Sequence, residues 1–293
     1  MRCLIAASIA IAAVAAEGSA QRASGVVARP GAATSKATTT ARASTPRESR
    51  RRTVIVDAGH GGVDRGMSGR TTSGRRIYEK DVTLAVARLL ADRLEKAGVR
   101  VVMTRTADTL IGLYDRGPIA NAAEGDLFIS VHVNAANPNW KDPSGARGFE
   151  TYFLAEAKTE DERRVAAMEN EAVQFESAAG LPKRDDALGF MMNDLLQNEH
   201  LRESSDLATT VQQRMKTIHP GPSRGVKQGG LVVLIKAFMP AVLVEIGFGS
   251  NPAEADWMTS AAGQAEIADA ISQAAVDYLA RYERRVSGGT GGK

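Results

Sequence analysis

Two histidines and two glutamates occupy positions where apolar segments of the sequence begin or end. His60 and His132 each lie at the end of a short apolar run. Glu79 opens an amphipathic segment, and Glu245 lies near the end of another apolar run. Burying a polar group without a partner costs about 1–3 kcal/mol, so such positions need an explanation. Sites in α/β proteins form at the carboxyl ends of strands, where we expect these four side chains to meet.

The chemistry open to these residues is narrow because the chain has one cysteine, Cys3. Cys3 lies in a segment expected to be removed on export, which leaves no thiol nucleophile, disulfide or cysteine-ligated zinc. Two histidines and a glutamate with an open fourth position form a catalytic zinc arrangement. No compact metal motif of the His-Glu-x-x-His kind is present. On spacing alone, a metal site and two satisfied structural histidines are equally good interpretations.

Short apolar runs alternate with amphipathic segments, which is typical of an α/β protein with a mostly parallel sheet. Strands are expected at 54–56, 99–103, 127–133, 149–154, 231–235 and 242–246. Helices are expected at 79–97, 113–123, most of 160–217, and 262–284, with a loop at 63–78. Pro118 should kink the second helix or mark its true start. Asn251 before Pro252 is an N-cap signal for one more helix.

The first 52 residues differ in composition from the rest. Residues 1–20 combine Arg2, an apolar stretch at 4–16 and small residues after it, which predicts a secretory signal peptide too short to span a membrane. A buried N-terminal helix is the alternative. Residues 21–52 are rich in Ala, Thr, Ser and Arg, which predicts a disordered basic linker, either a passive spacer or a tether to an anionic polymer. We therefore expect an exported protein, periplasmic or extracellular.

The distribution of charge argues against a nucleic-acid partner. The formal net charge of +3 comes from residues 21–52, which hold eight basic side chains and one acidic side chain. Residues 53–293 hold 28 basic and 32 acidic side chains and are mildly acidic. The electrostatic reason to propose DNA or RNA binding is thus absent from the folded part. We predict one catalytic domain at 53–284 and a flexible tail at 285–293.

Five sequence motifs surround the four residues named first. They are Val-Ile-Val-Asp-Ala-Gly-His-Gly-Gly at 54–62, Tyr-Glu-Lys-Asp-Val-Thr-Leu at 78–84, Thr104-Arg105 with Leu113, Arg116 and Asn121, Leu-Phe-Ile-Ser-Val-His-Val-Asn-Ala at 127–135, and Pro-Ala-Val-Leu-Val-Glu-Ile-Gly-Phe at 240–248 with Ser-Asn-Pro at 250–252. In this order they resemble the zinc-dependent N-acetylmuramoyl-L-alanine amidases of the type 3 family. The resemblance covers about residues 53–282. It implies a twisted six-stranded sheet flanked by helices.

The resemblance also implies a reaction and its residues. The substrate would be peptidoglycan, cleaved between the lactyl group of N-acetylmuramic acid and the L-alanine of the stem peptide. His60, Glu79 and His132 would be ligands of a Zn²⁺ ion, and Glu245 the catalytic carboxylate. Zinc lowers the pKa of bound water toward ~7 and polarises a carbonyl. A carboxylate beside that water can carry its proton to the leaving nitrogen.

Other motif residues have less certain roles or depart from the family. Asp57 and Asn134 would orient an imidazole or the substrate, or else act as turn and cap residues. Arg105 and Arg116 are expected to hold loops or strands together. The loop between the first two motifs is longer than expected, and Arg65 stands where the family commonly has proline.

Residues 155–200 form an acidic, helical insertion after the fourth strand. Some relatives that act in cell division have an inhibitory helix here, with a glutamate in the zinc's open position. Glu169, Glu171 and Glu176 are the candidates in this chain. A protein activator would then have to draw the helix away. The alternative is a solvated helical hairpin with no regulatory role.

Two other functional classes stay open at this stage. One is a different secreted zinc hydrolase, such as a carboxypeptidase, and products cut inside the stem peptide would favour it. The other is a non-catalytic peptidoglycan-binding protein that keeps the fold. The presence of Glu245 and all three expected ligands argues against that second class. The favoured role is a cell-wall hydrolase in remodelling or daughter-cell separation.

Overall fold

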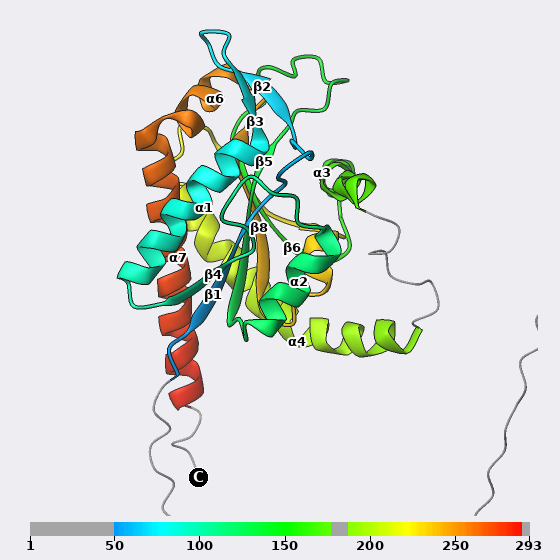
Figure 1. The fold of residues 1–293 in the computed structure, drawn as a ribbon, viewed down its shortest axis with the longest axis vertical. Helices are drawn as coiled ribbons and strands as arrows, with labels where there is room; N and C mark the ends of the chain where they lie inside the picture. The colour runs from blue at the N-terminus through cyan, green and yellow to red at the C-terminus, as the bar shows by residue number, and fades with distance from the viewer. Residues whose placement is uncertain (1–49, 177–186, 289–293) are drawn as a thin grey trace, which may run out of the picture. The chain divides into compact units, whose positions relative to one another are not determined.

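One six-stranded sheet organises the part of the chain that the computed structural model describes, residues 50–176 and 187–288 (Figure 1). The strands lie in the order β4 (Arg100–Met103), β1 (Thr53–Ala58), β5 (Leu127–Asn134), β8 (Ala241–Phe248), β6 (Phe149–Leu154) and β7 (Ser223–Gly229). The first four strands are parallel to one another. β6 pairs antiparallel with β8 and parallel with β7. The predicted α/β class with a mostly parallel sheet is confirmed.

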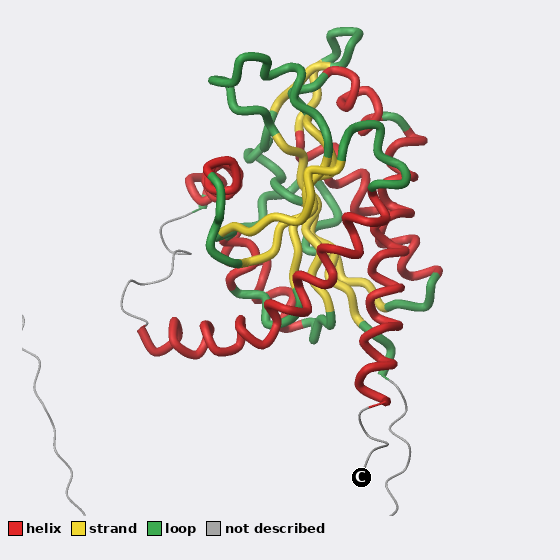
Figure 2. The backbone as a smooth tube through the Cα atoms, turned by 180° about the vertical axis from the view of Figure 1, so that it is seen from behind, coloured by secondary structure: helices red, strands yellow, loops and turns green. Residues whose placement is uncertain are grey.

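Helices cover both faces of the sheet (Figure 2). One face packs against α1 (Glu79–Lys96), α4 (Ala187–Met215) and α7 (Ala261–Gly288). The other face packs against α2 (Leu113–Ala122), α3 (Glu160–Asn170) and α5 (Val232–Ile235). A 3₁₀ turn, η1 (Glu171–Phe175), follows α3, and α6 (Pro252–Thr259) precedes α7. The predicted N-cap is confirmed, since the Asn251 side chain accepts from the amides of Ala253 and Glu254.

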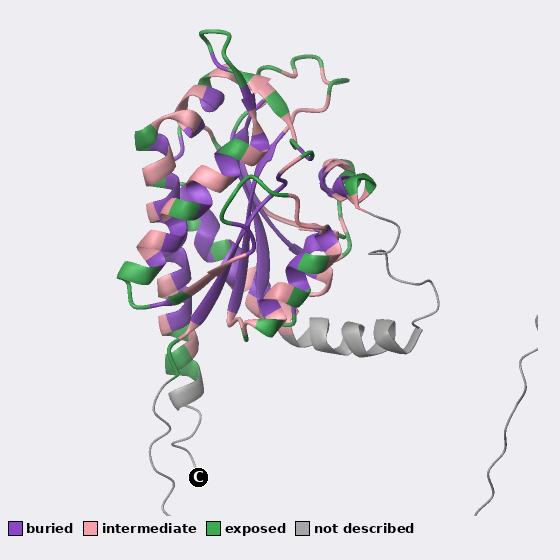
Figure 3. Cartoon of the chain, in the orientation of Figure 1, coloured by how far each residue is buried: buried purple, intermediate pink, exposed green. Residues whose placement is uncertain are grey.

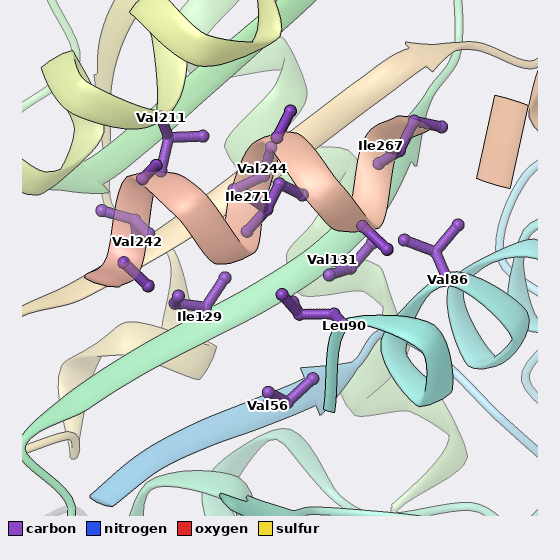
Figure 4. Packing of buried hydrophobic residues seen from close by; sticks show 14 of the residues in the cluster. Val56, Val86, Leu90, Ile129, Val131, Val211, Val242, Val244, Ile267 and Ile271 are labelled. Atoms are coloured by element: carbon purple, nitrogen blue, oxygen red, sulfur yellow. The ribbon is translucent and has the colours of Figure 1, made fainter. Parts of the chain in front are cut away.

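The core on the first face follows from the alternation of side chains along the strands. Strand residues such as Val56, Val131 and Val244 point toward α1 and α7, where Leu90 and Ile271 meet them (Figure 4). All five are fully buried. Figure 3 shows the matching pattern on the helices, which are buried where they face the sheet and exposed on the outside. Burial of this apolar surface stabilises the layers.

On the second face the alternate strand positions change from apolar to polar toward the carboxyl edge. Asp57 of β1, Ser130 and His132 of β5 and Glu245 of β8 occupy these positions, and all are buried. β6 runs in the opposite direction, so its second residue, Glu150, lies opposite Glu245 at the same edge. Strand order and alternation therefore gather buried charges at one end of the sheet.

Three local expectations differ from the structure. The predicted strand at 231–235 is wrong: Val232–Ile235 is a short helix, and the apolar run packs as buried helix surface, which periodicity over so few residues cannot distinguish from a strand. The sixth strand is instead the polar edge strand β7. The predicted loop at 63–78 contains a hairpin of β2 (Ser68–Arg70) and β3 (Arg76–Tyr78). Pro118 lies inside α2, so it does not mark the start of that helix.

The folded body begins within the predicted linker. Arg50, Arg51 and Arg52, the end of the predicted linker, bond to Asp126 and to carbonyls at 98–99 and 124 and so belong to the folded body. Residues 1–49, 177–186 and 289–293 lie outside the described part, so the signal peptide and most of the linker do too. Within residues 50–176 and 187–288, no helix has the length and apolarity to cross a membrane.

Candidate metal centre

His60 lies just after the C-terminal end of β1, in an unusual backbone turn. Its φ of 59° lies in the left-handed region, and Gly61 and Gly62 follow with φ of 135° and 62°. A non-glycine residue there is strained, and such strain persists where the surroundings enforce it. Asp64 supplies part of that enforcement, because its Oδ2 lies 2.8 Å from His60 Nδ1. His60 Nε2 is thereby turned toward the centre of the site.

Glu79, the first residue of α1, is fixed by two backbone amides. Its Oε2 accepts from the amide of Met67 at 2.8 Å, and its Oε1 accepts from the amide of Val133 at 2.8 Å. Gly66 leaves the space that this carboxylate needs, because a Cβ there would lie 2.5 Å from Glu79 Oε2. The two imidazoles outweigh the effect of burial and hold the pKa of Glu79 far below its usual value.

His132 approaches the same carboxylate from β5. Its Nδ1 lies 3.1 Å from Glu79 Oε1, and the rings of His132 and His60 are 5.0 Å apart between centroids. The ring fits only because residue 59 is glycine: a Cβ there would lie 2.5 Å from His132 Nε2. Burial opposes the charged form, but Glu169 and Glu79 outweigh it and raise the pKa of His132 to about 9.

A second carboxylate, Glu169 of α3, enters the space between the two histidines. Its Oε2 lies 2.6 Å from His132 Nδ1 and 3.3 Å from His60 Nε2. Burial favours the neutral acid, yet the imidazole of His132 prevails and lowers the pKa of Glu169. Of the three insertion glutamates singled out in the sequence, only Glu169 reaches the histidines. Glu176 instead accepts from the amide of Leu113 at the start of α2, and Glu171 is exposed.

The four side chains form a cluster suited to a metal ion. One ligand atom from each of His60, Glu79, His132 and Glu169 lies within 4.8 Å of all the others, and all four residues are buried. His60 Nε2, His132 Nδ1 and Glu169 Oε2 converge without making a well-formed hydrogen bond. Buried polar atoms rarely lack a partner, and nitrogen and oxygen donors at this spacing suit zinc. The residues present therefore fit a divalent metal.

Glu245 lies beside this cluster on the strand next to His132, with which it shares a register position. The residue is fully buried, and neither carboxylate oxygen has a hydrogen-bond partner. Burial is the main cause that raises the pKa of Glu245 well above its usual value, and the charges of Glu169 and Glu79 add to it. An unpartnered carboxylate whose pKa is raised by its neighbours is suited to accept and release a proton.

Several motif residues turn out to build the support around the cluster. Asp57 does not bond an imidazole: it pairs with Arg116 at 2.7 Å and accepts from Thr104 and Ser130. Asn134 donates to Glu150 at 3.2 Å. Both residues lie within strands, so neither is a turn or cap residue.

Arg105 and Arg116 bond to carbonyls after β1, including those of Ala58 and Gly59, and hold the turn that carries His60, as expected. Sequence reasoning missed Asp64, although its position four residues after His60 in a glycine-rich turn was the available signal.

Comparison with known proteins agrees with this geometry. The model of the N-acetylmuramoyl-L-alanine amidase family matches residues 54–277. The chain is 32% identical over 238 residues to N-acetylmuramoyl-L-alanine amidase AmiA of Escherichia coli K12, covering 80% of this chain and 78% of AmiA. The chain belongs to this amidase family.

Solved structures support the same assignment. An N-acetylmuramoyl-L-alanine amidase from Clostridium difficile 630 matches with a TM-score of 0.57 and 31% identity, over 79% of this chain and 98% of that one. AmiC2 of Nostoc punctiforme matches with a TM-score of 0.55 and 26% identity, over 78% and 97%. The chain is thus an amidase that acts on peptidoglycan, as the sequence resemblance implied.

A cavity of about 540 Å³ opens from the metal cluster of this amidase toward solvent. His60, Glu79 and Glu169 form its inner wall, and Arg65 lines it nearer the surface. Apolar groups complete the lining, among them Val63 and Phe175, whose side chains are 70% and 39% exposed. α3 and η1 form one side, so the cavity is bounded by the predicted insertion.

Proposed function

We propose that this amidase cleaves the bond between N-acetylmuramic acid and L-alanine with one zinc ion held by His60, Glu79 and His132, and with Glu245 as proton carrier. The observation that carries this proposal is the set of convergent nitrogen and oxygen atoms without hydrogen-bond partners. Two histidines and a glutamate leave one zinc position free for chemistry. Asp64 on His60 supplies the outer contact that typically fixes a ligating imidazole.

The chain's own residues then account for proton movement. Bound zinc supplies Lewis-acid polarisation of the amide carbonyl and a lowered pKa for water. Glu245 accepts the proton from the water whose oxygen forms the new bond to the lactyl carbonyl carbon. As the carbon–nitrogen bond breaks, Glu245 delivers that proton to the amine of L-alanine. Rigid placement on β8 keeps this carboxylate oriented for both transfers.

We further propose that the protein acts outside the cytoplasm, in wall remodelling or daughter-cell separation. The N-terminal 20 residues carry the sequence pattern of a signal peptide. The relatives include the N-acetylmuramoyl-L-alanine amidases AmiA and LytC, the latter from Bacillus subtilis at 29% identity. Peptidoglycan lies outside the cytoplasmic membrane, so export is required for the proposed activity.

Digestion of purified peptidoglycan tests the reaction. The protein should release stem peptides with a free L-alanine amine when it is incubated with zinc. It should release none in a parallel incubation that contains a chelator. Mass analysis of the products separates the alternatives, because a carboxypeptidase would shorten the stem peptide and leave it on the glycan. Binding to the wall without any product would instead support the non-catalytic alternative.

We also propose that Glu169 inhibits the enzyme by occupying the fourth zinc position. Its Oε2 lies 2.6 Å from His132 Nδ1, closer than Glu79 Oε1, which lies 3.1 Å from the same nitrogen. A carboxylate is a good zinc ligand, so Glu169 would exclude water from the position where it must react. An activator protein that binds the displaced α3 would then switch the enzyme on.

Release of α3 has to break apolar as well as polar contacts, because its Val165 and Ala166 are buried in the core of the second face. The N-terminus of α3 is closed by a capping box between Thr159 and Glu162. Its C-terminal residue Asn170 donates to the carbonyl of Gly230 and accepts from the amide of Val232. These polar contacts can be exchanged for water at a net cost of about 1 kcal/mol each. An activator that releases the helix must therefore cover Val165 and Ala166 as well as bind the open state more tightly than the closed one.

Replacement of one side chain tests inhibition without removing the helix. Glu169→Ala should raise the initial rate on dye-labelled peptidoglycan, by roughly tenfold if the closed state is favoured by about 1.4 kcal/mol. Glu160→Ala, on the same helix but exposed and outside the cavity lining, is the matched control and should leave the rate unchanged. Zinc content is measured in both variants. A folded, zinc-loaded Glu169→Ala protein with the wild-type rate would show that α3 is scaffold rather than inhibitor.

A further inference from the structure

Arg65 is a cation placed at the metal cavity without an acidic partner. Its residue is exposed and lines the same 540 Å³ cavity as His60 and Glu79. Among the described residues, no carboxylate lies within ion-pair distance of its guanidinium. The neighbouring carboxylate, Asp64, is already committed to His60 and to the amide of Gly66. The positive charge of Arg65 is therefore available to a ligand.

The backbone around Arg65 is fixed although its side chain is exposed. The Arg65 carbonyl accepts from the amide of Lys80 in the first turn of α1. Gly66 next to it packs against Glu79 and His60, where a Cβ would lie 2.5 and 2.6 Å from their atoms. The guanidinium carbon lies 5.0 Å from the centre of the Tyr78 ring, a cation–π contact that limits its directions. Arg65 is thus a positioned cation and not a freely moving surface charge.

We propose that Arg65 is a specificity-determining residue that binds a free carboxylate of the stem peptide, on the peptide side of the scissile amide. This inference rests on the proposed function. A guanidinium presents a planar donor pair that matches a carboxylate. N-acetylmuramic acid is neutral once its lactyl carboxyl is joined to the peptide, so an anion near the scissile bond must come from the peptide. The second stem residue, a γ-linked glutamate, supplies one where its α-carboxylate is not amidated.

The cavity lining agrees with this orientation of the substrate. Val63, two residues before Arg65, offers exposed apolar surface that suits the methyl group of alanine. Glu169 and Glu171 are the acidic groups of the lining that lie on the inserted segment rather than on the fixed wall. If α3 and η1 leave together, the negative charges of Glu169 and Glu171 leave the cavity while Arg65 stays. The open enzyme then presents a more positive cavity than the closed one.

Binding of two muramoyl peptides that differ only in amidation tests the role of Arg65. The full chain carrying Glu169→Ala and Glu245→Gln, loaded with zinc, has an open site and leaves the ligand uncleaved. The peptide with a free α-carboxylate should bind roughly fivefold more tightly than its amidated form, as expected for a partly exposed ion pair. Arg65→Gln should abolish that difference, while binding of the amidated peptide stays the same.

The control is Arg76→Gln, which removes an exposed arginine of β3 that lies outside the cavity. This variant should keep the fivefold preference. An unchanged preference in Arg65→Gln, or no preference in the parent chain, would overturn the inference. The proposed function is tested separately by the chain with Glu245 intact: release of L-alanine amines from both peptides supports it, even if Arg65 proves irrelevant to the choice between them.

Discussion

Buried histidines occur in two regions of this amidase, and their surroundings differ. His219 follows α4 and lies between Phe149 and Trp257, with ring centroids 4.8 and 4.7 Å away. Its Nδ1 accepts from the amide of Gly221 and its Nε2 lies 3.1 Å from the carbonyl of Ile246. Both ring nitrogens are thus satisfied by neutral backbone groups. The histidines of the metal cluster face carboxylates instead and leave nitrogen atoms without hydrogen bonds.

The difference shows that burial alone does not make a functional histidine. Burial without nearby charge lowers the pKa of His219 to about 4. In the metal cluster burial acts in the same direction, but Glu79 and Glu169 outweigh it and the pKa of His132 rises to about 9. Glutamates show the same contrast: both oxygens of Glu254 accept backbone amides, from Gly148 and Phe248, while those of Glu245 accept none.

Replacement of each buried histidine in turn should give the largest difference between the two regions, and the difference is in zinc retention. His60→Ala and His132→Ala should abolish zinc retention after dialysis, because each removes one of the two imidazoles among the proposed ligands. His219→Ala should retain a full equivalent of zinc, although it leaves the Gly221 amide without its acceptor. Metal content is measured by atomic emission on folded protein. Full occupancy in both His60→Ala and His132→Ala would refute the ligand assignment.

The glutamates provide the next test. Glu245→Gln should keep the fold and the zinc yet lose ~10²-fold or more in kcat, since the amide cannot accept and pass on a proton. Glu254→Gln should instead lower the melting temperature, because one of two buried amides loses its acceptor, at a cost of about 1–3 kcal/mol.

Steady-state rates and thermal unfolding of both glutamate variants give the answer. Turnover near the wild-type value in Glu245→Gln would make Glu245 a structural residue. A large loss of kcat in a well-folded Glu254→Gln would instead show that the two buried glutamates are not functionally distinct.

Much of the sheet could be predicted because its strands are buried on both faces and read as continuous apolar runs. The motifs predicted that His60, His132 and Glu245 lie at the carboxyl edge of the sheet, and the structure places them there together. β7 escaped prediction because it is a polar, half-buried edge strand without alternation. The strand predicted at 231–235 was wrong because five apolar residues fit a buried helical turn as well as a strand.

The arrangement of the metal cluster was less accessible from sequence. Glu169, Glu171 and Glu176 share one acidic segment, and only the path of α3 decides which of them reaches the histidines. Asp57 likewise stands three residues before His60 but points to Arg116, because alternation on β1 and the position of α2 fix its partner. Such choices depend on packing between elements distant in sequence, for which a single sequence carries no local signal.

At low pH, His219 and the histidines of the metal cluster should affect the free energy of unfolding differently. The pKa of His219 falls from 6.5 in the unfolded chain to about 4 in the folded one. Between these values the unfolded chain binds a proton that the folded chain does not, so acidification favours unfolding. The stabilisation is complete above pH 6.5 and is lost as the pH falls toward 4, by roughly 2 kcal/mol after allowance for partial solvent contact.

His219→Phe removes the titrating group while keeping an aromatic ring between Phe149 and Trp257. The variant is expected to be less stable at pH 7, since the Gly221 amide loses its acceptor. The informative quantity is therefore the slope of the melting temperature against pH between 6.5 and 4, which should be shallower than in the wild type. Other groups that titrate in this window are common to both proteins and cancel in the difference. Parallel slopes would show that His219 is protonated equally in both states, and the contrast with the metal cluster would then rest on hydrogen bonding alone.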